Sequence, residues 1–202
     1  KKPFDMPAHP SAGNHDNTLA NALMYYYGSQ NKPFVYRCIN RLDRDTTGLT
    51  IVAKHALAGG ILGNAVAKRA IHRTYYAVCS GCTPACMRIS APIARKDAST
   101  IERCVDFKRG ENAVTDFIRI KYNPDNNLSL VKLRLLTGRT HQIRVHMKYI
   151  GFPLIGDFLY NPDYTYISRQ ALHSGRLVFT HPVTGQKMNL ISDIPSDMKS
   201  LF

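Results

Sequence analysis

The segment of residues 128–135 places the strongest constraint on the fold. Apolar Val131 and Leu133 alternate there with charged Lys132 and Arg134, which is the period of two expected of a strand with one buried and one solvated face. Three further stretches rich in apolar or β-branched residues predict strands at residues 49–53, 75–79 and 115–122. The chain is therefore expected to build much of its core around a β-sheet.

Helical periodicity is found in three other segments, residues 18–27, 55–70 and 139–150. In the second, which three glycines weaken, Leu57, Ile61 and Ala65 are expected to face the core. Short turns join the predicted strands as often as helices do, and no linker or low-complexity segment interrupts the chain. These features predict one α/β domain of the α+β type, with a mixed, largely antiparallel sheet flanked by helices.

The charge balance indicates an anionic partner. The 202 residues include 27 Lys and Arg against 14 Asp and Glu, a formal charge of +13, and basic residues gather between residues 68 and 109. Neutralising phosphates releases counterions and adds affinity, so nucleic acid suits such a surface, although a merely solubilising surface is the alternative. No apolar run is long enough to span a bilayer, and we expect a cytoplasmic protein without a membrane partner.

The run Arg-Leu-Asp-Arg-Asp-Thr-Thr-Gly-Leu at residues 41–49 combines two acids and two bases in a turn-prone stretch before a predicted strand. A carboxylate beside a guanidinium group stays ionised and can act as a nucleophile or a base. The alternative is a turn whose side chains cap backbone amides. Both interpretations remain open from the spacing alone.

Residues 39–49 also closely resemble the catalytic-aspartate motif of the RluA-type pseudouridine synthases. A second signature of that family is matched at residues 136–147 and 151–157, about a hundred residues later and in the right order. Shorter matches at residues 9–11, 73–77, 169–173 and 181–185 extend the resemblance over nearly the whole chain. One departure is Asn40, where many members carry His.

The resemblance implies isomerisation of uridine to pseudouridine in RNA on the pseudouridine synthase fold. It assigns catalysis to Asp43 as nucleophile or base, to Tyr75 as a ring stacked on the target base, and to Arg144 as the partner of Asp43. Substrate binding is expected at Arg41, Arg44, Arg139 and His141. Of these, Arg41 matches an arginine implicated in displacing the target nucleotide, Arg139 is expected to contact phosphate or support the structure, and His141 is expected at a helix start.

The reaction neither adds nor removes atoms, and the sequence contains no nucleotide-binding glycine loop or redox motif, so we expect no cofactor and no metal. Cys79, Cys82 and Cys86, with Cys104 or His72, are the alternative, as zinc ligands. The expected partner is ribosomal or transfer RNA, bound by a monomer. The chain starts at Lys1, where family members have an early strand, so we expect a fragment that lacks this strand and possibly an S4-type RNA-binding domain.

Two other functions fit parts of the sequence. A non-catalytic RNA-binding or ribosome-assembly factor would share the basic surface but would not need Asp43, Tyr75 and Arg144 together. The spacing of Asp43, Asp45 and Thr47 also fits the Asp-x-Asp-x-Thr pattern of magnesium-dependent phosphotransferases. In those enzymes the motif follows its strand, whereas here a strand is predicted after it.

Overall fold

A computed structural model describes residues 1–11, 13–98 and 101–202. The chain forms two compact units. The first unit consists of Lys1–His72 and Arg176–Ser192, and the second consists of Arg73–Gly175 and Asp193–Phe202.

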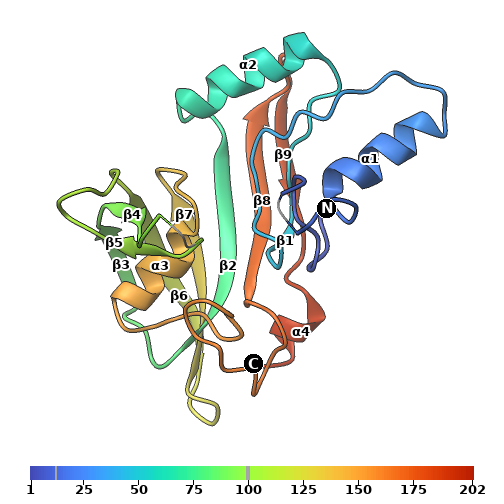
Figure 1. Ribbon diagram of the computed structural model, residues 1–202. Helices are drawn as coiled ribbons and strands as arrows, with labels where there is room; N and C mark the ends of the chain where they lie inside the picture. The colour runs from blue at the N-terminus through green and yellow to red at the C-terminus, as the bar shows by residue number, and fades with distance from the viewer. Residues whose placement is uncertain (12, 99–100) are drawn as a thin grey trace. The chain divides into compact units, whose positions relative to one another are not determined.

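The first unit has two helices beside a short antiparallel pair of strands (Figure 1). Its elements are α1 (Leu19–Gly28), β1 (Thr47–Gly48), α2 (Ala56–Ala67), the second half of β8 (Leu172–Thr180) and β9 (Lys187–Ile191). Ala58 and Leu62 of α2 pack against Leu177 and Phe179 of β8 and form the core of this unit. Strands β8 and β9 are antiparallel, and their pairing runs from Arg176 opposite Ile191 to Thr180 opposite Lys187.

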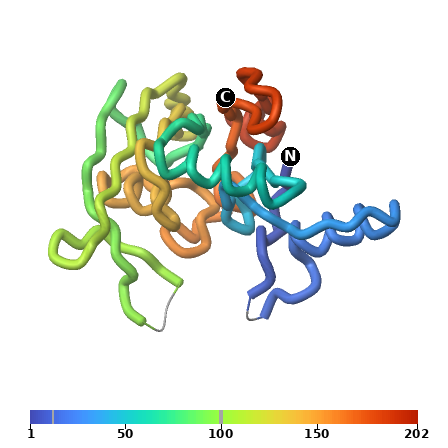
Figure 2. Tube along the Cα trace, turned by 90° about the horizontal axis from the view of Figure 1, so that it is seen from above, coloured from blue at the N-terminus to red at the C-terminus, as the bar shows by residue number. Residues whose placement is uncertain are grey.

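Helix α1 begins at a reciprocal cap, in which Thr18 and Asn21 each bind the backbone N–H of the other. Helix α1 extends away from α2, and the segment after it runs back toward α2 (Figure 2). This position leaves Met24 and Tyr25 47% and 80% exposed. The helix is therefore fixed by its cap and a few contacts rather than by a buried stripe.

The second unit is built on an antiparallel sheet in which β2 pairs with β7, β7 with β6, and β6 with β3. Its elements are β2 (His72–Ser80), β3 (Cys86–Ser90), β4 (Ile93–Arg95), β5 (Arg103–Val105), β6 (Val114–Asn123), β7 (Leu128–Leu135), α3 (Gln142–Tyr149), the first half of β8, and α4 (Ser196–Lys199). Strands β4 and β5 form a separate hairpin. This arrangement confirms the predicted α+β class with a largely antiparallel sheet.

The two faces of this sheet are covered differently. Thr115 of β6 binds the side chains of Gln142 and His146, so α3 lies on the face that carries Thr115. Tyr75 is on this face too, since it is paired with Leu133, two residues from the Leu135 that is paired with Thr115. The neighbouring Tyr76 points the other way, into a core that includes C-terminal residues. The register thus places the two adjacent tyrosines on opposite faces of the sheet.

The predicted helices at residues 18–27, 55–70 and 139–150 are confirmed within a few residues, as are the strands at 75–79, 115–122 and 128–135. The strand expected at residues 49–53 is wrong. That segment makes a single β-bridge, between Val52 and Cys38. The Ile51 N–H donates to the side-chain Oδ1 of Asn40 at 2.8 Å, so it is not available to a backbone carbonyl of a neighbouring strand. No helix among the described residues is long and apolar enough to cross a membrane.

Candidate functional site

Asp43 lies in a tight turn of the first unit. The N–H of Thr46 donates to the carbonyl oxygen of Asp43 at 3.1 Å, and the preceding Leu42 is 5% exposed and anchors the turn in the core. The Asp43 side chain itself is half-buried. A carboxylate in this position is held by its backbone and remains partly open to a reactant.

A buried lysine holds the same turn from outside the motif. The Nζ atom of Lys2 donates to the carbonyl oxygens of Pro3, Met6 and Arg44 at 2.7–2.8 Å. The Lys2 backbone exchanges two hydrogen bonds with Gly48, at 2.7 and 3.0 Å. Gly48 has a φ of +109°, which a residue with a Cβ rarely adopts. Sequence reasoning missed Lys2, because nothing in its local pattern separates it from a surface lysine.

The other charged residues of the motif have different surroundings. Asp45 is 9% exposed, and its carboxylate accepts from the Arg44 guanidinium at 3.3 Å. Arg44 also lies 3.8 Å from Asp5. Arg41 is exposed. The pKa of His9 is lowered first by the burial of His9 and second by the positive charge of Arg41. Asp45 is thus tied to its neighbour, and Arg41 presents its charge to solvent.

Asn40 supports the motif through its amide. Its Oδ1 accepts from Ile51 N–H at 2.8 Å and its Nδ2 donates to the Leu49 carbonyl oxygen at 3.4 Å, while its own carbonyl accepts from the Thr50 hydroxyl at 2.7 Å. The side chain is 3% exposed. Asn40, the residue that departs from the family pattern, therefore stabilises the segment after the turn, because both polar atoms of its buried amide are hydrogen-bonded to the backbone of Leu49 and Ile51.

Tyr75 and Arg144 belong to the second unit. Tyr75, on β2, is 4% exposed, and Arg144, on α3, is 1% exposed. The Nε and Nη2 atoms of Arg144 donate to the two carboxylate oxygens of Asp157, each at 2.7 Å. Such a buried, two-pronged pair fixes the plane of the guanidinium group.

Asp157 belongs to the second family signature, but the motif alone did not indicate its role. It is fully buried, and its Oδ1 also accepts the backbone N–H groups of Leu159 and Tyr160 at 3.1 and 3.2 Å. The preceding Gly156 has a φ of +67°, and a Cβ there would lie 2.1 Å from the Arg169 carbonyl oxygen. The Gly-Asp pair, rather than Asp157 alone, is the signal from which the role could have been found.

Tyr160 links Arg144 to the hairpin. Its ring centroid lies 4.9 Å from the guanidinium carbon of Arg144, and its hydroxyl accepts the Arg103 N–H at 2.8 Å and shares a 2.9 Å hydrogen bond with Nδ1 of His141. Burial raises the pKa of Tyr160 to about 12, so the phenol stays neutral. His141, expected at the helix start, is the N-cap residue of α3, with a left-handed φ of 56°.

Arg139 lies just before α3 and is exposed. It forms an ion pair with Glu111, and its Nε donates to the Asn112 carbonyl oxygen at 3.1 Å. Its backbone N–H donates to Gln142 Oε1 at 3.0 Å, and the Gln142 amide nitrogen reaches Val114 on β6. The start of α3 is thereby tied to the sheet.

The cysteines proposed as an alternative zinc site are separated in environment. Cys79 is buried on β2, whereas Cys82 and Cys86 are exposed. Within residues 1–11, 13–98 and 101–202, no group of three or more His, Cys, Asp or Glu residues is arranged to hold a metal ion.

The expected site residues thus fall into two sets. Asp43, Arg41 and Arg44 belong to the first unit, and Tyr75, Arg139, His141 and Arg144 belong to the second. Arg144 forms an ion pair with Asp157. The pairing of Arg144 with Asp43 stays a prediction.

Comparison with known proteins identifies the family. The model of the RNA pseudouridylate synthase family matches residues 1–149. An uncharacterized RNA pseudouridine synthase of Bacillus subtilis is 39% identical over 201 residues, which cover 99% of this chain and 66% of that protein. The ribosomal large subunit pseudouridine synthase D of Zymomonas mobilis is 38% identical over 218 residues, with 100% and 67% covered.

Solved structures agree. The human RNA pseudouridylate synthase domain containing 1 matches with a TM-score of 0.78 and 25% identity, covering 95% of this chain and 77% of that one. The chain spans about two thirds of the length of the curated relatives named above. The family match contains Asp43, Tyr75 and Arg144, and it confirms the resemblance to RluA-type enzymes. The chain belongs to the RNA pseudouridylate synthase family.

Proposed function

We propose that this protein isomerises uridine to pseudouridine in structured RNA. In this reaction the N1–C1′ bond breaks, the uracil ring turns, a C5–C1′ bond forms, the C5 proton leaves and N1 gains a proton. The observation that carries the proposal is the turn that holds a half-buried Asp43 within the segment matched by the family.

Asp43 acts in this proposal as the nucleophile or the base toward the nucleotide. Arg144 keeps the Asp43 carboxylate ionised and aimed, because an adjacent guanidinium group favours the charged form. The support for this role is that Asp157 binds Nε and Nη2 of Arg144 and so fixes the plane of the guanidinium group.

Tyr75 stacks on the target base, and Arg41 fills the position in the RNA stack that the displaced nucleotide leaves. A base inside a helix cannot reach a carboxylate, so the target is flipped out or already unpaired, at a cost of a few kcal/mol. The exposure of Arg41 suits a group that enters an RNA stack. Arg44, Arg139 and His141 contribute to substrate binding.

The proposed partner is ribosomal or transfer RNA, bound by a cytoplasmic monomer without a cofactor. Large-subunit ribosomal RNA is the first substrate to test, because it is the RNA in the name of the Zymomonas mobilis relative. The formal charge of +13 favours any such polyanion.

The test is release of tritium from RNA labelled at C5 of uridine, since only formation of the C5–C1′ bond frees that atom. Transcribed ribosomal RNA and transfer RNA are incubated with the protein and with its Asp43→Asn variant. Release by the parent alone supports the proposal. If both proteins bind RNA and neither releases tritium, the chain is a non-catalytic RNA-binding factor.

A further inference from the structure

A cavity of about 510 Å³ in the second unit has four arginines among its nine lining residues. Arg95 comes from β4, Arg103 from β5, Arg109 from the turn after the hairpin, and Arg139 from the segment before α3. Glu111 is the one acid in the lining. Four guanidinium groups and one carboxylate give these walls a formal charge of +3.

We propose that this cavity binds phosphodiester groups of the RNA backbone. The inference rests on the proposed function for the choice of RNA as the polyanion. It adds a binding site formed by four segments of the chain, and it assigns that site to the RNA backbone rather than to a base.

Two of the four guanidinium groups have only neutral partners among the described residues. Arg95 donates to the Ala98 carbonyl oxygen at 3.3 Å. Arg103 donates to the carbonyl oxygens of Ile101 and Glu102 at 3.3 and 3.4 Å. Carbonyl acceptors orient a guanidinium group without cancelling its charge. Phosphate oxygens gain the most from such charged, pre-oriented donors.

The other two arginines carry exposed ion pairs. Arg109 is paired with Asp106 at 2.7 Å, and Arg139 with Glu111, whose side chain is 69% exposed. Surface pairs of this kind are worth about 0–1 kcal/mol. A phosphate can therefore replace Glu111 at Arg139 at little cost, and the N–H groups of both arginines that face solvent remain open to it.

The lining also explains why the ligand is backbone. Exposed aromatic rings that could stack on a base do not occur among the lining residues, which besides the charged ones are Ile93, Ala94, Gly138 and Thr140. A site of guanidinium groups and small side chains recognises the charge and the spacing of phosphates, and contacts of this kind carry no information about the base sequence.

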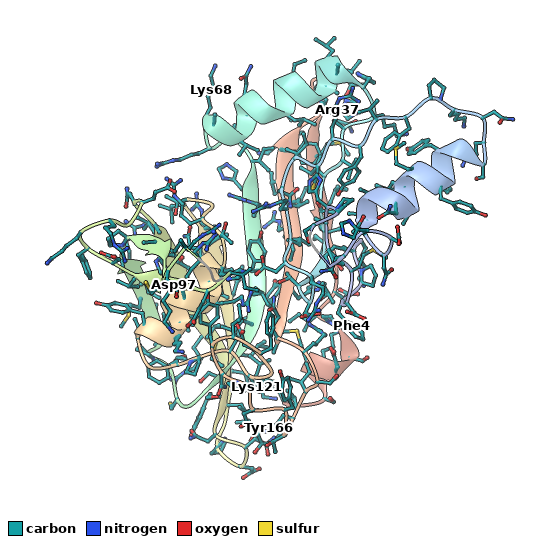
Figure 3. All side chains as sticks on the ribbon, in the orientation of Figure 1. Phe4, Arg37, Lys68, Asp97, Lys121 and Tyr166 are labelled. Carbon is teal, nitrogen blue, oxygen red and sulfur yellow. The ribbon has the colours of Figure 1, made fainter. Side chains whose placement is uncertain are left out.

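Hydrogen bonds to Tyr160 and Glu111 anchor the hairpin that bears Arg95 and Arg103. The Arg103 N–H donates to the Tyr160 hydroxyl at 2.8 Å, and Ile93 exchanges two hydrogen bonds with Glu111, both at 2.9 Å. The hairpin continues through Asp97, labelled in Figure 3, toward Ser99 and Thr100, which lie outside the described residues. Arg95 and Arg103 thus lie on a pair of strands that is anchored to the rest of the unit.

The experiment measures binding of a fluorescein-labelled 20-nucleotide RNA hairpin by anisotropy at several salt concentrations. Arg95→Gln and Arg103→Gln are each expected to weaken binding about 3- to 10-fold near 0.1 M salt. Each should also reduce the slope of log K against log salt by about 0.7–0.9, the amount expected for one lost phosphate contact. Arg95→Lys keeps the charge and should retain the slope.

Arg176→Gln is the matched control. Arg176 is an exposed strand arginine of the first unit whose Nε donates to Asn189, so its loss removes one charge without touching the cavity. We expect less than a twofold effect and an unchanged slope. If Arg95→Gln and Arg103→Gln behave like Arg176→Gln, the proposal is wrong.

Inorganic phosphate and pyrophosphate distinguish a free anion from an RNA strand. Pyrophosphate that binds the parent below 1 mM, together with unchanged RNA affinity in both variants, would make the cavity a small-anion site and overturn the proposal. The binding assay does not depend on turnover. A parent that binds RNA without forming pseudouridine would refute the proposed function alone, and a parent that forms pseudouridine with indifferent variants would refute this inference alone.

Discussion

Asp43 and Asp45 lie two residues apart and are held in different ways. Asp45 is buried and paired with Arg44, whereas the Asp43 side chain is half-buried at the head of the turn. We expect Asp43→Asn to reduce tritium release at least about 10³-fold, since the swap keeps the shape and removes the charge. RNA affinity should stay within about twofold. An Asp43→Asn protein that still turns over would remove Asp43 from the mechanism.

Asp45→Asn is the companion variant. It should keep activity within about tenfold but lower the free energy of unfolding by about 1 kcal/mol, because a partly buried charge-assisted hydrogen bond is weakened. Urea denaturation measures this loss. A stability loss for Asp45→Asn together with an activity loss for Asp43→Asn separates the structural acid from the chemical one.

Arg144 is expected to serve both stability and chemistry. Arg144→Met leaves Asp157 buried without its partner and should cost about 3–5 kcal/mol of stability, besides most of the activity. Arg144→Lys keeps the charge but loses the planar fork, so its activity should lie between those of Arg144→Met and the parent. Rates are compared only for variants that retain the parent circular dichroism.

A double-mutant comparison tests the pairing of Arg144 with Asp43. If the two act as a unit, adding Arg144→Lys to Asp43→Asn should change the rate hardly at all. Full additivity of the two effects, or an Arg144→Lys protein that only loses RNA affinity, would make Arg144 an RNA contact and turn attention to Arg139.

The pair between Arg144 and Asp157 marks the limit of what the sequence reveals at this scale. The family motifs identified Asp43, Tyr75 and Arg144 as a set, but no local pattern says which acid lies beside a buried arginine. That information depends on how Gly156 permits the chain to pass close to Arg169. Lys2 is a similar case, since its burial depends on three carbonyl oxygens brought together by the turn.

At the scale of single elements, α2 shows where periodicity fails. Of the expected stripe, Leu57 and Ile61 are wrong, because they are 69% and 41% exposed while Ala58 and Leu62 are buried. Ala65 does pack against the core. Three glycines in the helix leave little side-chain mass on several of its faces, so adjacent registers look equally apolar. The packing partners Leu177 and Phe179 of β8, more than a hundred residues away, decide between them.

Two leucines of α2 therefore form a matched pair for mutation. Leu62→Ala should lower the free energy of unfolding by about 2–5 kcal/mol, because it leaves a cavity against β8. Leu57→Ala should change it by less than about 0.5 kcal/mol, since the side chain is already in water. Equal losses in urea denaturation would contradict the register found here.

The loop after α3 contains a second matched pair. Tyr160→Phe removes the hydroxyl that accepts the Arg103 N–H and bonds His141, and it should cost about 1–3 kcal/mol. If this hydroxyl positions the hairpin, the variant should also bind RNA more weakly, while its rate at saturating RNA changes less. Tyr164→Phe, at an exposed tyrosine of the same loop, should leave both quantities unchanged.

At the scale of the whole molecule, the sequence is informative about class and charge. Strand alternation and short connections predicted the antiparallel sheet, and the strands β2, β6 and β7 confirm it. The strand predicted at residues 49–53 was wrong for a reason that composition does not reveal. The Ile51 N–H donates to the side-chain amide oxygen of Asn40 instead of to the backbone of a neighbouring strand. Long-range pairings of this kind set the topology, while local pattern sets the list of elements.

Stability of the whole molecule should also depend on pH through a buried histidine. His146 is fully buried; its Nε2 lies 2.9 Å from the Ala91 carbonyl oxygen and its Nδ1 lies 2.9 Å from the Thr115 hydroxyl. This pattern suits a neutral ring that donates from Nε2, and burial lowers the pKa of His146 below its ordinary 6.5. Protons then bind the unfolded chain more readily than the folded one, so stability is full above pH 6.5 and falls as the pH drops below it.

The measurement is urea denaturation of the parent between pH 7.5 and 5. The slope contributed by one such histidine has an upper limit of about 1.4 kcal/mol per pH unit. His9, whose pKa is lowered first by burial and then by Arg41, acts in the same direction, so His9→Gln is the control that removes its share. His146→Gln should be less stable than the parent at pH 7.5 and should lose less stability on acidification. A His146→Gln protein that keeps the full parent slope would show that His146 does not carry this pH dependence.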